Sequence, residues 1–227
     1  MRPITHRELK MRRNPIKAGF TLLEMMVVIL IIGVLAAVLL PNVFEAMGTA
    51  KTSACEMNMR RLYELLIQYK IKNKDQFPRD EGQKFILRLW GDRVCEHTEQ
   101  NARRFFCVED PLESYVAVET GETFQEYLES WKDAGPDFIS YAGFTSGGDR
   151  KEARKLLRKG NTTIVACGHL SHRDTVVYMT ANGDVHRLKV SDLLEDGLLT
   201  EADIEDQYLP LGPSSPIEAL RTVTSEY

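Results

Sequence analysis

The longest apolar stretch of the chain lies near its N-terminus, at residues 20–40. Only Thr21, Glu24 and Gly33 interrupt these 21 residues. A helix rises about 1.5 Å per residue, so this stretch would measure roughly 32 Å, close to the ~30 Å hydrocarbon thickness of a bilayer. The pattern therefore predicts a membrane-spanning helix, which we place at residues 20–41.

Beyond this stretch the pattern becomes amphipathic. In residues 45–72 apolar side chains recur at three- and four-residue steps, and most charged residues fall on other sides. The apolar positions are Ala50, Ala54, Met57, Leu62, Leu65, Leu66 and Tyr69. Pro41 removes one backbone donor, but a helix can continue through such a residue where neighbours pack against it. We therefore expect one long helix whose second half, residues 45–72, packs against a globular head.

The strongest β pattern lies at residues 162–190. Three runs, TTIVAC, TVVYMTA and DVHRLKV, have the length and composition of strands. Asn182-Gly183 joins the last two, and this pair favours a type I′ turn in which both residues have positive φ. A small sheet with one apolar face needs a cover, which the amphipathic helix can supply. The predicted fold class is α+β, with the long helix packed on a small antiparallel sheet.

Shorter elements are expected along the rest of the head. Asp80 and Gln83 resemble a capping box ahead of a short helix, and Asp149 can cap a basic helix that stops at Gly160. Further expected elements are a helix at 123–131, a strand within 137–144, and helices at 150–159, 191–195 and 200–205. Three prolines and a glycine follow Leu209, so residues 209–227 are expected to form a flexible tail. The expected globular head is therefore residues 42–208.

Glu24 is the residue that does not fit a simple membrane span. A carboxylate at membrane depth costs about 2.5–3.5 kcal/mol, so it is normally matched to a partner or a function. Cleavage between Gly19 and Phe20 would create an α-amine four residues before it. In a bundle of staggered copies, the Glu24 of one subunit could neutralise the amine of the next. Such a pair would set the axial register of an assembly; the simpler alternative is a signal anchor whose glutamate reaches the interface.

Charge predicts the orientation of this span. Residues 1–19 carry six basic side chains against one acidic one, whereas the chain as a whole has a net charge of −4. A basic flank before a single apolar span stays cytoplasmic, so the acidic head is expected to cross the membrane. The basic segment is short and lacks aromatic residues, so no nucleic-acid partner is expected. A conventional secretory signal has a shorter apolar core and would not carry Glu24 within it.

The motif K-A-G-F-T-L-L-E, from Lys17 to Glu24, resembles the processing signal of type IV pilins and type II secretion pseudopilins. Glycine stands before the expected cut, phenylalanine after it and glutamate at the fifth position of the product. Gly33 and Pro41 resemble helix-loosening positions of pilin N-terminal helices. The resemblance implies that a prepilin peptidase removes residues 1–19 and that the Phe20 nitrogen is methylated.

The same resemblance implies a structural subunit rather than an enzyme. Its expected partners are prepilin peptidase, other pilin or pseudopilin subunits, an inner-membrane assembly platform with its ATPase, and the lipid bilayer. Its expected location is the inner membrane, as a single-pass protein with a cytoplasmic N-terminus and a periplasmic head. The alternative from another class is a monomeric, membrane-anchored binding module or enzyme that uses the same signal.

Four cysteines follow the apolar span, at positions 55, 95, 107 and 167. A periplasmic head would permit disulfides, and four cysteines allow three pairings. We favour the local pair Cys95–Cys107, which would close a short loop and contribute about 3 kcal/mol. The competing pair is Cys55–Cys107, which would tie the long helix to the loop beside it.

Metal and catalytic patterns are weak. Thiolate and imidazole are preferred zinc ligands, and the candidates of these types are Cys167, His169, His172 and His186. Their spacing is not that of a standard zinc finger, so no metal is assigned. Asp133, Asp137 and Asp149 are calcium candidates by residue type, but they do not form an EF-hand run. The chain also lacks a P-loop, a Gly-x-Ser-x-Gly motif and a His-Glu-x-x-His motif, and no cofactor is expected.

A second resemblance involves residues far apart in the chain. The residues that carry it are Cys55, Asn58, Arg60 and Leu62 on the expected helix, and later His172 followed, after nine intervening residues, by Asn182-Gly183. In these residues the chain is similar to a bacterial group of prepilin-like proteins named for an H-x9-DG motif. This chain has asparagine where that motif has aspartate.

Overall fold

The computed structural model describes residues 20–226, with the exception of 111, 113, 114 and 173. The chain divides into two compact units, the first ending at Glu45 and the second beginning at Ala46. Gly19 and the rest of the expected leader lie outside the described residues. The head was expected at residues 42–208. The second unit begins close to that position, at Ala46, and continues beyond residue 208.

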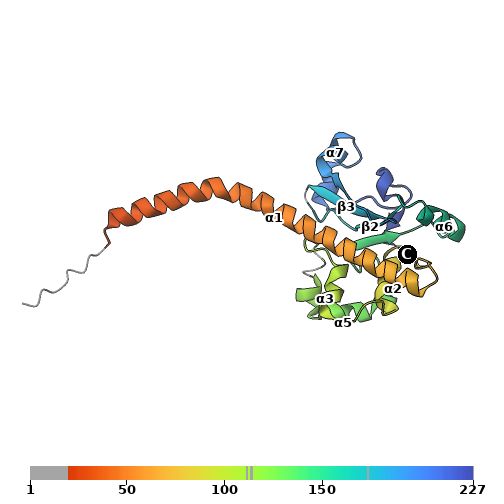
Figure 1. Ribbon diagram of the computed structural model, residues 1–227. Coiled ribbons are helices and arrows are strands. Elements are labelled where there is room, and N and C mark those ends of the chain that lie inside the picture. The colour runs from red at the N-terminus through yellow and green to blue at the C-terminus, as the bar shows by residue number, and fades with distance from the viewer. Residues whose placement is uncertain (1–19, 111, 113–114, 173, 227) are drawn as a thin grey trace, which may run out of the picture. The chain divides into compact units, whose positions relative to one another are not determined.

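Helix α1 runs without interruption from Leu22 to Lys72 and contributes to both units (Figure 1). The prediction of a single long helix is confirmed, and Pro41 does not end it. In the head the buried side of α1 is formed by Cys55, Met59, Leu62, Leu65, Leu66 and Tyr69. Met57 was expected on this side but is exposed, because Cys55 and Met59 occupy the turn that faces the core.

Short helices connect α1 to the sheet and follow it. They are α2 (Gln83–Gly91), α3 (Glu99–Ala102), η1 (Arg103–Phe105), the π-helical η2 (Tyr115–Thr120), α5 (Phe124–Glu129), η3 (Trp131–Asp133), α6 (Arg150–Arg158), α7 (Val190–Glu195), α8 (Glu201–Glu205) and η4 (Glu218–Leu220). The predicted cap of α6 is confirmed: the Asp149 side chain accepts the amide hydrogens of Lys151 and Glu152.

The sheet is antiparallel and has the strand order β4-β3-β2-β1-β5. Its strands are β1 (Tyr141–Phe144), β2 (Thr163–Cys167), β3 (Thr175–Thr180), β4 (Val185–Lys189) and β5 (Val223–Thr224). The α+β fold class is therefore confirmed. The expected strand within residues 137–144 is limited to β1, and β5 lies in the segment that was predicted to be a tail.

The hairpin between β3 and β4 forms as predicted, but its turn is of another type. Gly183 has a φ of 91°, whereas Asn182 is not among the residues with positive φ. The amide of Thr180 donates to the carbonyl of Asp184 at 3.0 Å, so three residues form the loop and glycine takes the left-handed position. A Cβ at Gly183 would lie 2.4 Å from the Tyr63 ring on α1. Packing against α1 therefore requires glycine here.

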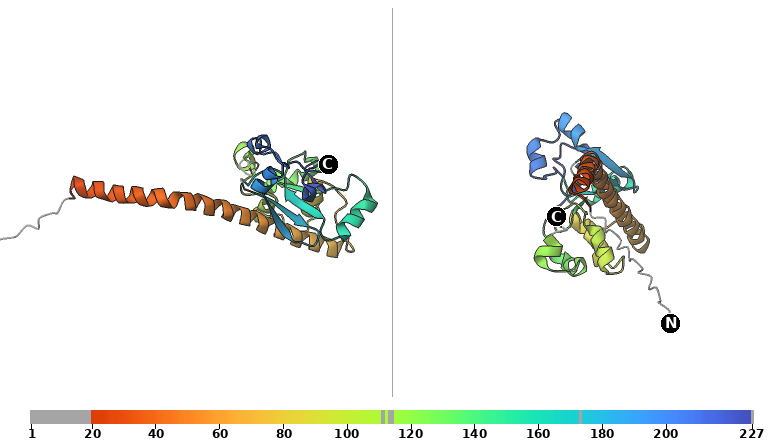
Figure 2. Two further views of the ribbon diagram at one scale, coloured as in Figure 1. Left: turned by 90° about the horizontal axis from the view of Figure 1, so that it is seen from above. Right: turned by 90° about the vertical axis from the view of Figure 1, so that its left-hand side faces the viewer.

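Both faces of the sheet are covered, although only one cover was expected. One core lies between the sheet, α1, α2 and residues 102–107. A second core lies on the opposite face, where α7 and the C-terminal segment pack (Figure 2). Its members include Ala142, Ala166, Val176, Leu193, Leu209, Ile217, Leu220 and Val223. The prediction of a flexible tail from residue 209 is therefore wrong, because this segment supplies the apolar side chains that cover the outer face of the sheet.

The expected capping box of Asp80 and Gln83 is also wrong. Gly82 is the N-cap residue of α2, and no side-chain hydrogen bond caps the start of this helix. Gln83 is buried and points instead to the segment before β1, where it donates to the carbonyl of Ile139 at 2.6 Å and accepts the amide of Phe138 at 2.8 Å. A local capping motif was thus replaced by a tertiary contact between α2 and the strand.

Glu81 anchors the loop that links β1 to α6. Its carboxylate accepts the hydroxyl hydrogens of Thr145 at 2.7 Å and of Ser146 at 2.6 Å, and the amide of Gly148 at 3.2 Å. Burial acts to raise the pKa of Glu81, but these hydrogen bonds outweigh it and hold the pKa below its ordinary value. The charged form is therefore the one that the loop stabilises.

We expect Glu81→Gln to lower the free energy of unfolding by about 1–2 kcal/mol at pH 7, because the charge-assisted hydrogen bonds are lost. A carboxylate with a lowered pKa in the folded state contributes stability above its unfolded-state pKa and loses it as the pH falls through the folded pKa. The difference between variant and wild type should therefore shrink below about pH 4. Urea denaturation of the full chain in detergent at several pH values measures this, with the exposed Glu205→Gln as control; a difference that is constant with pH would contradict it.

Candidate functional site

The expected cleavage point lies directly before Phe20. Phe20 is 79% exposed, and α1 starts two residues later. The side chains of Thr21 and Glu24 form a reciprocal cap: the Glu24 amide donates to Thr21 Oγ1 at 3.2 Å, and the Thr21 amide donates to a Glu24 oxygen at 2.8 Å. Glu24 therefore closes the first turn of its own helix and remains exposed.

The apolar part of α1 has the properties of a membrane span. Leu22–Leu40 has a mean hydropathy of 2.9, and none of it is buried within the structure. It is a helix that is long and apolar enough to cross a bilayer, which agrees with a membrane-anchored protein. Gly33 lies inside this helix with open space around it, and α1 passes through Pro41 as a helix.

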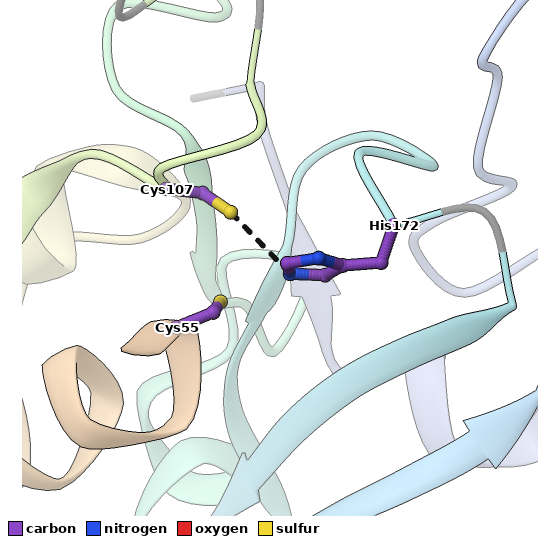
Figure 3. A group of neighbouring side chains, drawn as sticks. All are labelled: Cys55, Cys107 and His172. Atoms are coloured by element: carbon purple, nitrogen blue, oxygen red, sulfur yellow. Dashed lines mark hydrogen bonds between the residues drawn. The ribbon is translucent and has the colours of Figure 1, made fainter. Parts of the chain in front are cut away.

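The interior of the head contains a second group of chemically active side chains. Cys55 lies on α1, Cys107 follows η1, Cys167 ends β2, and His172 lies between β2 and β3. None of the four is more than 2% exposed. Figure 3 shows the sulfur atoms of Cys55 and Cys107 directed toward the imidazole of His172. Four segments that are distant in sequence thus converge on one buried point.

The distances within this thiol–imidazole group are short. Cys107 Sγ lies 3.4 Å from His172 Nε2, and Cys55 Sγ lies 3.9 Å from Cys167 Sγ. One ligand-type atom from each of Cys55, Cys107 and His172 lies within 4.8 Å of the others. The hydroxyl of the buried Tyr141 lies 3.6 Å from Cys55 Sγ. The group therefore has the residue types and the spacing that can hold a metal ion.

Polar neighbours fix the position of two members of the group. The carboxylate of Glu109 is hydrogen-bonded to Nδ1 of His172, which leaves Nε2 directed toward the thiols. Asn58, one turn after Cys55 on α1, donates from Nδ2 to the carbonyl of Phe106 at 3.2 Å. Because Phe106 directly precedes Cys107, this bond holds the Cys107 loop against α1.

The cluster favours negative charge on two of its sulfur atoms. A hydrogen bond with Cys55 lowers the pKa of Cys107 to about 7 and that of Cys167 to about 6, against the opposing effect of burial. Burial acts to lower the pKa of His172, but hydrogen bonds with Cys107 and Cys167 raise it to about 11. Hydrogen bonds of Cys55 with Cys107 and Cys167, together with burial, raise the pKa of Cys55 well above its usual value. The shifts follow from close packing of thiols around one imidazole.

A cavity of about 650 Å³ leads to the histidine side of this group. Lys51 Nζ lies 3.4 Å from Glu109 Oε1 at its wall. The lining residues include Lys51, Val108, Glu109, Asp110, Ser171 and His172. The group is therefore buried but not remote from solvent.

The favoured disulfide is not present in the structure. All four cysteines are free, so neither Cys95–Cys107 nor the competing pair Cys55–Cys107 is bonded. Cys95 is only partly buried, whereas Cys107 turns into the core toward Cys55 and His172. Nearness in sequence does not decide the neighbours of Cys107, because the loop that carries it packs against α1.

The structure brings together only part of the metal-ligand candidates drawn from the sequence. Cys167 and His172 join the group, but His169 lies beside Asp137 at 3.4 Å and His186 stacks on Tyr178. The calcium candidates belong to different elements: Asp133 lies in η3, and Asp149 caps α6. In the part of the chain that the structure describes, no carboxylate cluster of metal-binding spacing involves them.

Sequence reasoning did not bring Cys55 and Cys107 into the metal-ligand set. The distances of 112 and 65 residues that separate Cys55 from Cys167 and Cys107 from His172 give no motif spacing. A faint signal was present, because Cys55, Asn58 and His172 all belong to the second resemblance. These three residues lie in or next to the group.

Comparisons with known proteins match the N-terminal region. Residues 15–40 match a protein family described as "Prokaryotic N-terminal methylation motif". The chain is 44% identical over 52 residues to the "Type IV major pilin protein PilA" of Myxococcus xanthus, covering 23% of this chain and 24% of that protein. It is 37% identical over 57 residues to the "Type II secretion system core protein G" of Pseudomonas aeruginosa, covering 25% of this chain and 40% of that protein.

The likeness does not extend into most of the head. The matched segments span well under half of either relative, and no solved structure matches the chain. The methylation motif, the two relatives and the single apolar N-terminal helix agree with one another. In its N-terminal region, the chain is therefore similar to type IV pilins and type II secretion pseudopilins.

Proposed function

We propose that this chain is a structural subunit of a type II secretion pseudopilus or a type IV pilus-like fibre. A prepilin peptidase cuts it after Gly19, and the new N-terminal Phe20 is methylated. The observation that carries the proposal is the N-terminal match to the methylation motif, joined to an apolar helix that begins at Leu22. Its partners are copies of itself or related subunits and an inner-membrane assembly platform driven by an ATPase.

The position of Glu24 supports the assembly step. Its carboxylate lies on the first turn of an apolar helix, four residues after the proposed N-terminal amine. In a single chain it caps its own helix through Thr21. On assembly, the amine of a neighbouring subunit offers it an opposite charge in a setting where water is scarce, and such a pairing favours one axial stagger over others.

The processing step has a direct test. The full chain, expressed in a bacterium with and without an active prepilin peptidase, is recovered from membranes and its N-terminal peptide is sequenced by mass spectrometry. We expect a peptide that begins with N-methylated Phe20 only where the peptidase is active. Gly19→Leu should remain uncut, and the control Asn14→Ala, which lies outside the matched motif, should be cut normally.

Two results would contradict the proposal. One is a membrane protein that still begins at Met1 in the presence of the peptidase, and the other is a product that begins at any residue except Phe20. Either result would favour an anchored monomeric protein over a fibre subunit.

A further inference from the structure

We propose that the head binds one structural zinc ion through Cys55, Cys107, Cys167 and His172. The inference stands apart from the fibre role, because all four residues lie in the second unit of the chain. Three thiols and one imidazole are a ligand set that zinc prefers, and four protein ligands with no open position are typical of a structural site.

Two of the distances within the group match those between ligand atoms of a tetrahedral site. At a Zn–S bond length of about 2.3 Å, two sulfur ligands lie roughly 3.8 Å apart, and a sulfur and an imidazole nitrogen lie roughly 3.5 Å apart. Cys55 Sγ and Cys167 Sγ are 3.9 Å apart, and Cys107 Sγ is 3.4 Å from His172 Nε2. Ligand atoms of Cys55, Cys107 and His172 all lie within 4.8 Å of one another, and Cys167 adjoins them through Cys55.

The surroundings of His172 are those of a metal ligand. Histidines that bind zinc usually donate their other ring N–H to a carboxylate, which fixes the tautomer and directs the free nitrogen to the metal. Glu109 holds Nδ1 of His172 in this way, while Nε2 faces the thiols. Lys51 pairs with the same carboxylate from α1. The cavity along this side gives an ion a route to the group.

A disulfide explains these observations less well. It would join two sulfur atoms at about 2.05 Å and leave the third thiol and the imidazole without a role. The hydrogen bond from Glu109 would then orient the buried His172 toward sulfur atoms with which it shares no ligand. Shared coordination by one ion accounts for all four buried side chains.

Zinc bound here would connect the parts of the head. Cys55 belongs to α1, Cys107 to the segment after η1, Cys167 to β2 and His172 to the loop before β3. An ion held by all four would fasten α1 to both the sheet and the α3–α5 region. Because binding would favour the folded state alone, the metal should raise the thermal stability of the head.

The full chain, purified in detergent with a non-chelating reductant, provides the test. Elemental analysis after incubation with zinc and removal of excess metal should find a single zinc ion per chain. Replacement by cobalt should give the thiolate-to-metal charge-transfer band and the intense visible bands of a tetrahedral site. A strong chelator should lower the midpoint of thermal unfolding of the head.

Matched variants assign the ligands. Cys107→Ser and His172→Asn should lose the bound zinc, whereas Cys95→Ser and His186→Asn should keep it, because those residues lie outside the group. Glu109→Gln should keep the fold but weaken zinc affinity about 10–100-fold, as loss of an outer carboxylate does. The cobalt spectrum of the unmodified chain remains informative if a ligand variant fails to fold.

Three results would overturn the proposal. They are a metal-free protein with four reduced thiols after zinc incubation, a wild-type zinc content in both ligand variants, and a cystine between Cys55 and either Cys107 or Cys167 in a non-reduced digest of protein that was never exposed to chelator.

Discussion

Replacing Glu24 by alanine should leave processing intact and abolish assembly. The reason is that each Glu24→Ala subunit would leave the Phe20 amine of a neighbour without its counter-charge at membrane depth. Breaking a buried ion pair costs about 3–5 kcal/mol, so the assembled fraction should fall about 100-fold or more. The measurement is cross-linking in membranes through cysteines introduced on α1, where the wild type should give a ladder of oligomers and the variant a monomer.

The structure supplies a sharp control for this experiment. Glu24 also caps its own helix through Thr21, so Glu24→Ala removes a helix cap as well as a charge, and the two effects must be separated. Thr21→Val removes the two hydrogen bonds of the Thr21 hydroxyl and keeps the carboxylate, which can still accept the amide hydrogen of residue 21. It should assemble nearly as well as the wild type. Assembly by Glu24→Ala, or equal loss in both variants, would contradict the role of Glu24 in register, and a monomeric wild type would favour an anchored binding module.

Gly143→Ala should destabilise the head by about 3 kcal/mol. A Cβ at this position in β1 would lie 2.0 Å from the carbonyl oxygen of Gly82, which is the N-cap of α2. Relief would require a shift of backbone, and the Gly82 amide already donates to the Phe144 carbonyl at 2.8 Å. Urea denaturation of the full chain in detergent, followed by tryptophan fluorescence, measures the change.

Gly48→Ala is the matched control for Gly143→Ala. Gly48 lies on α1 with no atom near its potential Cβ. Alanine has a higher helix propensity than glycine, so this variant should be more stable by about 0.5–1 kcal/mol. Equal stability of Gly143→Ala and the wild type would mean that α2 and β1 do not approach as closely as described.

Elements governed by short-range patterns were predictable. The apolar pattern of α1, the strands β2 to β4 and the cap at Asp149 depend on residues within a few positions of one another, and the structure contains each of them. The predictions that were wrong concern residues whose contacts are distant in sequence. Gln83 was expected to cap a helix and instead bonds to the segment before β1, and the expected tail covers the outer face of the sheet.

The sequence by itself determined the N-terminal region: an apolar helix with one carboxylate, preceded by a motif whose residues are contiguous. Only the tertiary structure decided the environment of the cysteines and of His172. Their grouping depends on how α1, the Cys107 loop and the end of β2 pack around one point. Side-chain periodicity reports which face of an element is buried, but it carries no information about which distant element will lie opposite.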